Sequence, residues 1–294
     1  MKRHPLALIW YFGGKSHMIQ TILPFFPPHN VYVEVCGGGA ALLLNKKPAK
    51  FEVYNDVDSG LVGLFRVMAD PEMSKELAAR AAATPYSREL YDQCVATCTA
   101  DQYMCDDPVE QAWVFYLVAR QSWSGKFAGG WSHGITAKSA GRLRSWINAV
   151  DKLPEIATRL QGVQIESMDL LKLIPKYDGK DVLFYVDPPY VHETRRGEAY
   201  RHEMTMEQHC RMVVALMNVR GMVVLSGYRH DAYKALETNQ WRRYDFDAKC
   251  SAAGQRGTGD GQTRQKEARV ESLWLNPQTQ EALDGADDLL SMFA

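Results

Sequence analysis

An acidic residue, two prolines and a tyrosine follow an apolar run in the second half of the chain. Residues 182–186 (VLFYV) predict a buried strand, and Asp187, Pro188, Pro189 and Tyr190 come directly after it. The carboxyl ends of strands in open α/β sheets face the ligand crevice, so we expect Asp187 to point into a binding site. The prolines fix two φ angles and remove two N–H donors, which leaves the Pro188 carbonyl and the Asp187 carboxylate as a stiff pair of acceptors.

This acceptor pair suits a flat ring that carries an amino group, such as adenine or cytosine. Two acceptors on the amine hydrogens favour a pyramidal nitrogen and stabilise the positive charge that develops when it is alkylated. A nitrogen held in line with a sulfonium methyl group could displace it directly. The base must leave the duplex to be reached, and Tyr190 offers a face for stacking. The alternative is a proline turn that closes the strand, with Tyr190 in the core.

A glycine cluster suggests a second binding element. Residues 31–35 predict a strand, residues 40–45 a helix, and between them lie Gly37, Gly38 and Gly39. Asp56 follows a second predicted strand, 51–54, at the distance where an acid binds ribose hydroxyls in doubly wound folds. A tight turn and a helix N-cap are the alternatives. The chain has neither GxGxxG here nor a P-loop, which favours an adenosine ligand without pyrophosphate, such as S-adenosylmethionine.

The composition permits a large core and excludes several classes of protein. The chain has 294 residues, of which 46% are hydrophobic, and no apolar run long enough to span a membrane. Its six cysteines form no CxxC pair, so we expect reduced thiols in a cytoplasmic protein and no metal site. The net charge is −1, so any surface for nucleic acid must be local; residues 120–144 contain five Lys or Arg and no acid.

The order of the predicted elements indicates an α/β fold with an insertion. Strands and helices alternate up to about residue 65, and further strands are predicted at 163–165, 182–186, 221–228 and 269–275. Residues between these two parts are helix-prone. We therefore expect a mostly parallel sheet with helices on both faces in residues 1–65 and 147–294, and a mainly helical insertion at 66–146. The acidic tail from residue 281 is expected to be loosely held.

Several segments together resemble the Dam-like DNA adenine-N6 methyltransferases of bacteria and phages. They are YFGGK at 11–15, VEVCGGGAALLLN at 33–45, YND at 54–56, DPPY at 187–190, YRHEMTMEQH at 200–209, GMVVLSGY at 221–228 and ESLWLNP at 271–277. The resemblance spans most of the chain outside about 70–115. It implies a class I methyltransferase sheet of Rossmann-like type, S-adenosylmethionine as cofactor and N6-methyladenine in double-stranded DNA as product.

The resemblance also assigns site residues. It puts Glu34 and the glycine loop at the methionine end of the cofactor and Asp56 at its ribose. Asp169 is assigned to the cofactor adenine, with a helix N-cap as the equal alternative. The full cofactor set is Tyr11, Gly13, Gly14, Lys15, Glu34, Gly37, Gly38, Gly39, Asp56, Asp169 and Asp187. Cys36, where relatives often have another residue, is expected to be a neutral wall residue.

The insertion then becomes the target-recognition domain, because basic and aromatic side chains without acids suit phosphate contacts and a few base contacts. The candidate DNA-binding residues are Arg120, Trp123, Lys126, Lys138, Arg142 and Arg144, with Arg195, Arg196 and Arg201 in the loop after the DPPY motif. Residues 253–269 lack apolar anchors, and they either become ordered on DNA or have no part in binding. A solvated basic loop is the alternative for each.

Other functions stay open at this point. Cytosine-N4 methylation needs the same acceptors, although its enzymes more often have serine where this chain has Asp187. Methylation of a glutamine side chain usually has asparagine there. A catalytically inactive DNA-binding regulator would not need the complete motif. A cognate restriction enzyme, and a monomeric or weakly dimeric state, are not determined by the sequence.

Overall fold

The computed structural model describes residues 5–11, 13–99, 105–133, 140–191, 202–248 and 269–292. Four predicted DNA-binding residues lie outside these ranges: Lys138, Arg195, Arg196 and Arg201. Nearly all of the predicted loop at 253–269 lies outside them too. None of the described helices is long and apolar enough to cross a membrane.

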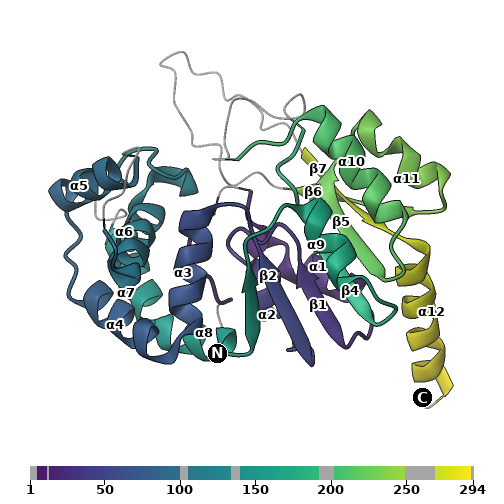
Figure 1. Cartoon of the computed structure of the whole chain (residues 1–294), viewed down its shortest axis with the longest axis horizontal. Helices are drawn as coiled ribbons and strands as arrows, with labels where there is room; N and C mark the ends of the chain where they lie inside the picture. Colours follow the sequence, from purple (N-terminus) through teal and green to yellow (C-terminus); the bar gives the residue numbers. More distant parts are fainter. Residues whose placement is uncertain are drawn as a thin grey trace.

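A seven-stranded sheet forms the centre of the molecule (Figure 1). Its strands are β1 (Val31–Glu34), β2 (Phe51–Asn55), β3 (Val163–Glu166), β4 (Val182–Val186), β5 (Met222–Tyr228), β6 (Arg242–Ala248) and β7 (Arg269–Leu275). The order is β3-β2-β1-β4-β5-β7-β6, and β7 alone runs antiparallel to its neighbours. The predicted mostly parallel sheet with helices on both faces is confirmed, as are the six predicted strands.

Strand β6 was not predicted. Its sequence RRYDFDA has a period of two, and Tyr244 and Phe246 both pack against the main core cluster. The ring of Phe25 lies 4.7 Å from that of Tyr244 and 5.7 Å from that of Phe246. The charged residues around the two aromatics made the segment read as polar. The alternation of aromatic and charged residues is the signal that could have revealed the strand.

Twelve α-helices are described, and they surround the sheet. They are α1 (Ile19–Ile22), α2 (Ala41–Asn45), α3 (Ser59–Ala69), α4 (Pro71–Ala82), α5 (Arg88–Thr99), α6 (Pro108–Gln121), α7 (Ala140–Asp151), α8 (Leu153–Leu160), α9 (Leu170–Tyr177), α10 (Met206–Met217), α11 (Lys234–Thr238) and α12 (Pro277–Met292). The short 3-10 helices are η1 (Lys15–His17), η2 (Leu23–Phe25), η3 (Trp123–Gly125) and η6 (Asp231–Tyr233).

The two faces of the sheet carry separate hydrophobic clusters, as the alternation of side chains along a strand requires. On β4, Phe184 and Val186 pack with helices α9, α10 and α11. Leu183 and Tyr185 point the other way and join the cluster formed with α1, α2, α3 and α8. Helices therefore cover both faces, and the carboxyl ends of the strands are left for a site.

Helices α4 to α7 lie together at one end of the molecule, beyond α3 (Figure 1). In the described part of residues 66–146, the regular elements are the end of α3, helices α4 to α6, η3 and most of α7, together with the isolated bridge between Ser122 and Trp131. Its core residues Leu77 and Tyr116 belong to the same hydrophobic cluster as Tyr54 of the sheet. The division at residues 66 and 146 thus stays a prediction, since the core runs across it.

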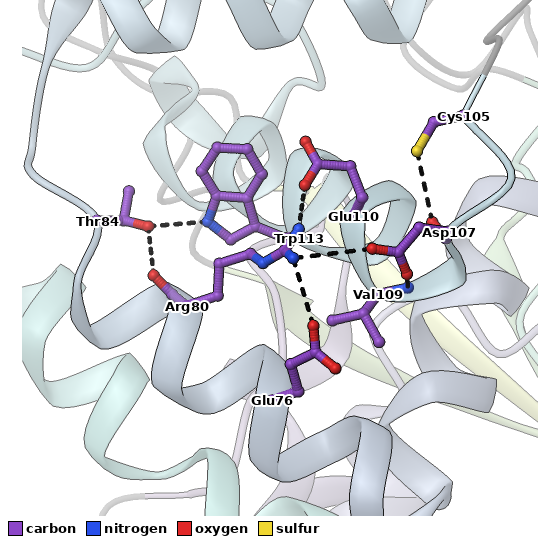
Figure 2. A network of polar contacts seen from close by, with 8 residues as sticks. All are labelled: Glu76, Arg80, Thr84, Cys105, Asp107, Val109, Glu110 and Trp113. Carbon is purple, nitrogen blue, oxygen red and sulfur yellow. Dashed lines mark hydrogen bonds and ion pairs between the residues drawn. The ribbon is translucent and has the colours of Figure 1, made fainter.

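An arginine joins the helices of this end (Figure 2). Arg80 of α4 lies among three carboxylates. Its partners are Glu110, Glu76 at 3.3 Å and Asp107 at 3.7 Å. Thr84 adds a second link between α4 and α6, because its hydroxyl donates to the Arg80 carbonyl and accepts from Trp113 Nε1 at 2.8 Å. One cation thus holds the start of α6 against α4.

The acidic tail differs from its prediction, because residues 277–292 form helix α12. The start of this helix is fixed to the sheet by Asn276 and Thr279, both buried. Their side-chain oxygens accept from the Val223 N–H of β5 at 2.9 and 2.8 Å. The proline and this anchored first turn give the segment a defined beginning that composition alone did not reveal.

Candidate active site

A cavity of about 480 Å³ opens where β1, β2 and β4 end. Its volume is in the range of small-molecule sites, and its place agrees with the rule that ligands bind at strand carboxyl ends. All the residues predicted to bind the cofactor line it: Tyr11, Gly13, Gly14, Lys15, Glu34, Gly37, Gly38, Gly39, Asp56, Asp169 and Asp187. Of the DPPY residues, Asp187 and Pro189 also line it, whereas Pro188 and Tyr190 do not.

The glycine loop is shaped by an aromatic side chain beneath it. A Cβ on Gly37 would lie 2.2 Å from the ring of Tyr54, which real contacts do not allow. Gly38 has a φ of +48°, a left-handed value that favours glycine. The Tyr54 hydroxyl donates to the Gly38 carbonyl at 2.9 Å, so ring and loop hold each other in place.

Asp56 supports this loop from the end of β2. Its carboxylate accepts from the Gly38 N–H and from the Asp58 N–H, both at 2.9 Å. Burial raises the pKa of Asp56 above its usual value. The helix cap considered for Asp56 belongs instead to Asp58, which accepts from the N–H groups of Gly60 and Leu61 at the start of α3. Asp56 therefore does not cap α3, and it lies on the cavity wall.

Glu34 is a buried acid at the end of β1. Its Oε2 accepts from the Tyr32 hydroxyl and from the Leu43 N–H, both at 2.8 Å. Burial raises the pKa of Glu34 to about 8, although these hydrogen bonds oppose the rise. Both bonds use one oxygen, so Oε1 is left for a donor on a ligand, and the carboxyl is largely protonated near neutral pH.

Asn55, at the end of β2, is a buried residue of the cavity wall. Its amide nitrogen donates to the Val35 carbonyl at 2.8 Å and the Met168 carbonyl at 3.1 Å, and its oxygen accepts from the Met168 N–H at 2.8 Å. One buried side chain thus ties the end of β1 to the loop after β3. This loop carries Asp169, which caps α9 by accepting from the Leu171 N–H at 2.8 Å and also lines the cavity.

Asp187 forms an ion pair with Lys15. The Lys15 ammonium lies 2.8 Å from Oδ1 and 2.7 Å from Oδ2, and it also donates to the Gly13 carbonyl at 3.0 Å. The pKa of Asp187 is raised to about 6, because burial outweighs the stabilising charge of Lys15 and a second acid, Glu271, adds repulsion. The predicted acceptor is therefore at the cavity, but its two oxygens both contact a lysine.

Tyr190 does not present an open face to the cavity. The residue is 5% exposed, and its hydroxyl donates to Glu271 and lies 3.2 Å from Ser226 Oγ. The Lys15 ammonium lies 4.8 Å from the centre of its ring, and the ring of Tyr228 lies edge-on at 4.5 Å. Stacking of a base on Tyr190 stays a prediction, and it requires this ring to be uncovered.

Part of the cavity wall was not assigned from the sequence. His202, Glu203 and Met204 line the cavity from the segment before α10, and Gln208 lines it from the first turn of that helix. Cys36 lines it as a wall residue, and burial raises the pKa of its thiol well above the usual value, so the thiol stays protonated. Among the described residues, no group of three His, Cys, Asp or Glu side chains could hold a metal ion.

One predicted DNA-binding residue makes contacts within the protein. Arg120 donates to the carbonyls of Ala7 and Leu8, the former through Nη2 and the latter through Nε at 2.9 Å, and burial lowers the pKa of its guanidinium. These bonds hold the guanidinium against the N-terminal segment, which is a structural role. The phosphate contact predicted for Arg120 stays a prediction.

Two of the other described candidates, Trp123 and Arg142, lie in contact. Trp123 is 48% exposed, and the Arg142 guanidinium lies 4.3 Å from the centre of its ring. Arg142 also donates to Ser132 Oγ, whereas Lys126 and Arg144 are exposed. An exposed aromatic ring beside an arginine is an arrangement that suits a nucleic acid.

Comparison with known proteins adds a family assignment. The sequence model described as D12 class N6 adenine-specific DNA methyltransferase matches residues 11–223. The modification methylase StsI of Streptococcus sanguinis is 33% identical over 66 residues, which are 22% of this chain and 10% of that protein, so the chain aligns with only about a tenth of this relative.

Two solved structures are similar at low levels. The rRNA methyltransferase aviRa from Streptomyces viridochromogenes is 12% identical, with a TM-score of 0.38 over 91% of this chain and 85% of that one. An rRNA methylase from Streptococcus thermophilus is 7% identical, with a TM-score of 0.35 over 90% and 96% of the two chains. These values are too low to carry an argument about the substrate.

Proposed function

Since the chain belongs to the D12 class of N6 adenine-specific DNA methyltransferases, we propose that it methylates the exocyclic amine of adenine in double-stranded DNA. S-adenosylmethionine is the proposed methyl donor. The observation that carries the proposal is the position of Asp187, an acceptor followed by two prolines, on the wall of a cavity of cofactor size.

The charges of the cavity fit this cofactor. Acidic side chains outnumber basic ones on its wall: Glu34, Asp56, Asp169, Asp187 and Glu203 against Lys15 and His202. A ligand with an ammonium and a sulfonium group is attracted to such a wall. The ammonium of the ligand would favour the ionised form of Glu34, whose Oε1 would then accept from it, and Asp56 would accept from the ribose hydroxyls. When bound, S-adenosylmethionine supplies an activated methyl group.

The chain's own groups prepare the target amine. Asp187 must be ionised, and one of its oxygens would accept an N–H of the adenine amine in competition with Lys15. The Pro188 carbonyl would accept the other N–H, since the prolines make this turn stiff. The two acceptors then hold the amine toward the cofactor and stabilise its positive charge during transfer.

DNA is proposed to bind over the surface formed by Trp123, Lys126, Arg142 and Arg144. Three of these residues carry positive charge for phosphates, and Trp123 offers an apolar face to a sugar or a base. This surface belongs to the helical residues 66–146, which we therefore propose as the target-recognition domain.

The test measures base, atom and residue separately. Expression in a host without adenine methylation, followed by mapping of modified bases, should give N6-methyladenine; label on cytosine N4 instead would support the alternative base. Asp187→Ala should lower the single-turnover rate by about 10² to 10³-fold while S-adenosylmethionine still binds, since a preorganised partner of the developing charge is lost. Wild-type turnover should decline as the pH falls through about 6, because Asp187 becomes protonated.

A further inference from the structure

A second carboxylate lies behind the proposed catalytic acid, on the antiparallel strand β7. Glu271 is 4% exposed, and its Oε1 lies 3.3 Å from the Lys15 ammonium. The same oxygen accepts from the Tyr190 hydroxyl and lies 3.4 Å from Ser226 Oγ. Glu271 does not line the cavity, so it contacts the ion pair from the side away from the cofactor site.

The ionisable groups around Glu271 come from three segments. They are Lys15 of η1, Tyr185 of β4, and Asp187 and Tyr190 of the turn after β4. Lys15 is the cation that contacts both acids, with Asp187 at 2.7 Å and Glu271 at 3.3 Å. The ammonium thus lies between two carboxylates and is closer to the one that the target amine needs.

This arrangement creates a requirement for the proposed reaction. While the Lys15 ammonium contacts both Asp187 oxygens, it competes with the adenine N–H for their lone pairs, and its charge offsets the negative charge that would stabilise the amine during transfer. If the buried ammonium left Asp187 without another acceptor, it would lose its counterion in a place that is 4% exposed, which is costly. Glu271 removes this cost, because a shift of a few tenths of an ångström brings Lys15 to an ordinary charge-assisted distance from it.

We propose that Glu271 is a positioning residue that takes over the Lys15 ammonium when the target amine engages Asp187. The inference rests on the proposed adenine methylation. Tyr190 links the two events, since its hydroxyl is held by Glu271 while its ring lies under the ammonium. When Lys15 moves toward Glu271, it leaves the Asp187 carboxylate to the base.

Glu271→Gln is the variant that tests this handover. Glutamine keeps the shape and can still accept from Tyr190, but it cannot balance the charge of Lys15. The single-turnover rate at pH 8 should fall on the order of tenfold, in the range found for coupled neighbours. The acid-side midpoint of the pH profile should move down by at least about half a unit, because a like charge near Asp187 is removed. The affinity for S-adenosylmethionine should not change.

Ser272→Ala is the matched control on the same strand. Ser272 is fully buried, and its hydroxyl donates to Asp245 at 2.7 Å on the other side of β7. Loss of that bond perturbs the strand without touching Lys15, so rate and midpoint should stay at the wild-type values. A Glu271→Gln enzyme that binds the cofactor and keeps the wild-type midpoint and rate would overturn the proposal.

Misfolding of Glu271→Gln and failure of the proposed function can each be distinguished from failure of the handover. Should Glu271→Gln not fold, Glu271→Asp keeps the charge but withdraws it by one methylene; we expect a slower rate with a midpoint near wild type, and an unchanged rate would refute the handover. Failure of the proposed function has a different signature, because the wild-type enzyme would then place no methyl group on adenine at any pH.

Discussion

Gly37→Ala tests the close approach between the glycine loop and Tyr54. The new Cβ would lie 2.2 Å from Cε2 and 2.6 Å from Cδ2 of that ring. The ring cannot move aside easily, because it is fully buried, stacks on Phe65 at 4.0 Å and donates its hydroxyl to Gly38. The clash must therefore be relieved by a shift of the loop or of the core.

The expected cost follows from these contacts. Overpacking of a well-packed core costs about 1–3 kcal/mol, and loss of the Tyr54 hydrogen bond to Gly38 would add about 1 kcal/mol. Because Gly38 also donates to Asp56, a displaced loop disturbs the cavity wall. Affinity for S-adenosylmethionine should fall on the order of tenfold, which corresponds to about 1.4 kcal/mol.

Urea unfolding and isothermal calorimetry with S-adenosylmethionine measure the two effects. Gly63→Ala is the matched control, since Gly63 lies in helix α3 with no atom within 4 Å of the added Cβ. That change should stabilise the protein by about 0.5–1 kcal/mol and leave the affinity unchanged. If Gly37→Ala unfolded at the wild-type midpoint and bound the cofactor equally well, the reasoning from loop geometry would be refuted.

Two further predictions concern charge. The folded state holds the proton of Glu34 up to a pKa of about 8, far above the value of an unfolded chain, so this group's contribution to stability is lost as the pH rises from about 5 to about 8. Glu34→Gln should remove a slope of order 1 kcal/mol per pH unit from urea-unfolding data without S-adenosylmethionine, and an identical slope would contradict the buried-acid assignment. Arg144→Glu should reduce the slope of log K against log[salt] for DNA binding by about 1 or more, whereas Arg211→Glu, on the distant helix α10 (Figure 1), should not; equal slopes would remove Arg144 from the DNA surface.

The sequence predicted those features that depend on local patterns. Apolar runs identified the six predicted strands, and breaks after them identified the glycine loop and Asp187. Because parallel strands end at one edge, the glycine loop, Asp56 and Asp187 could be expected at a common cavity, where they lie. The family resemblance supplied the rest of the cofactor set.

What could not be predicted depends on contacts between distant segments. Glu271 lies 84 positions after Asp187, and only the register of β7 on β5 brings it opposite Tyr228 and close to Lys15. Arg120 lies in a basic stretch without acids, so a phosphate contact was the natural interpretation; the carbonyls that hold it come from residues more than a hundred positions away. Composition describes a neighbourhood in sequence, whereas burial is decided by neighbours in space.

The contacts of Arg120 have a practical consequence for the start of the chain. Ala7 and Leu8 supply the carbonyls that satisfy a guanidinium of helix α6, and Tyr11, three residues later, already lines the cavity. Residues 7–11 thus connect helix α6 to the wall of the cofactor site. A purification tag at this terminus should be attached ahead of residue 5. Deletion of residues 7 and 8 would remove the hydrogen-bond acceptors of the Arg120 guanidinium and destabilise the cavity wall beside them.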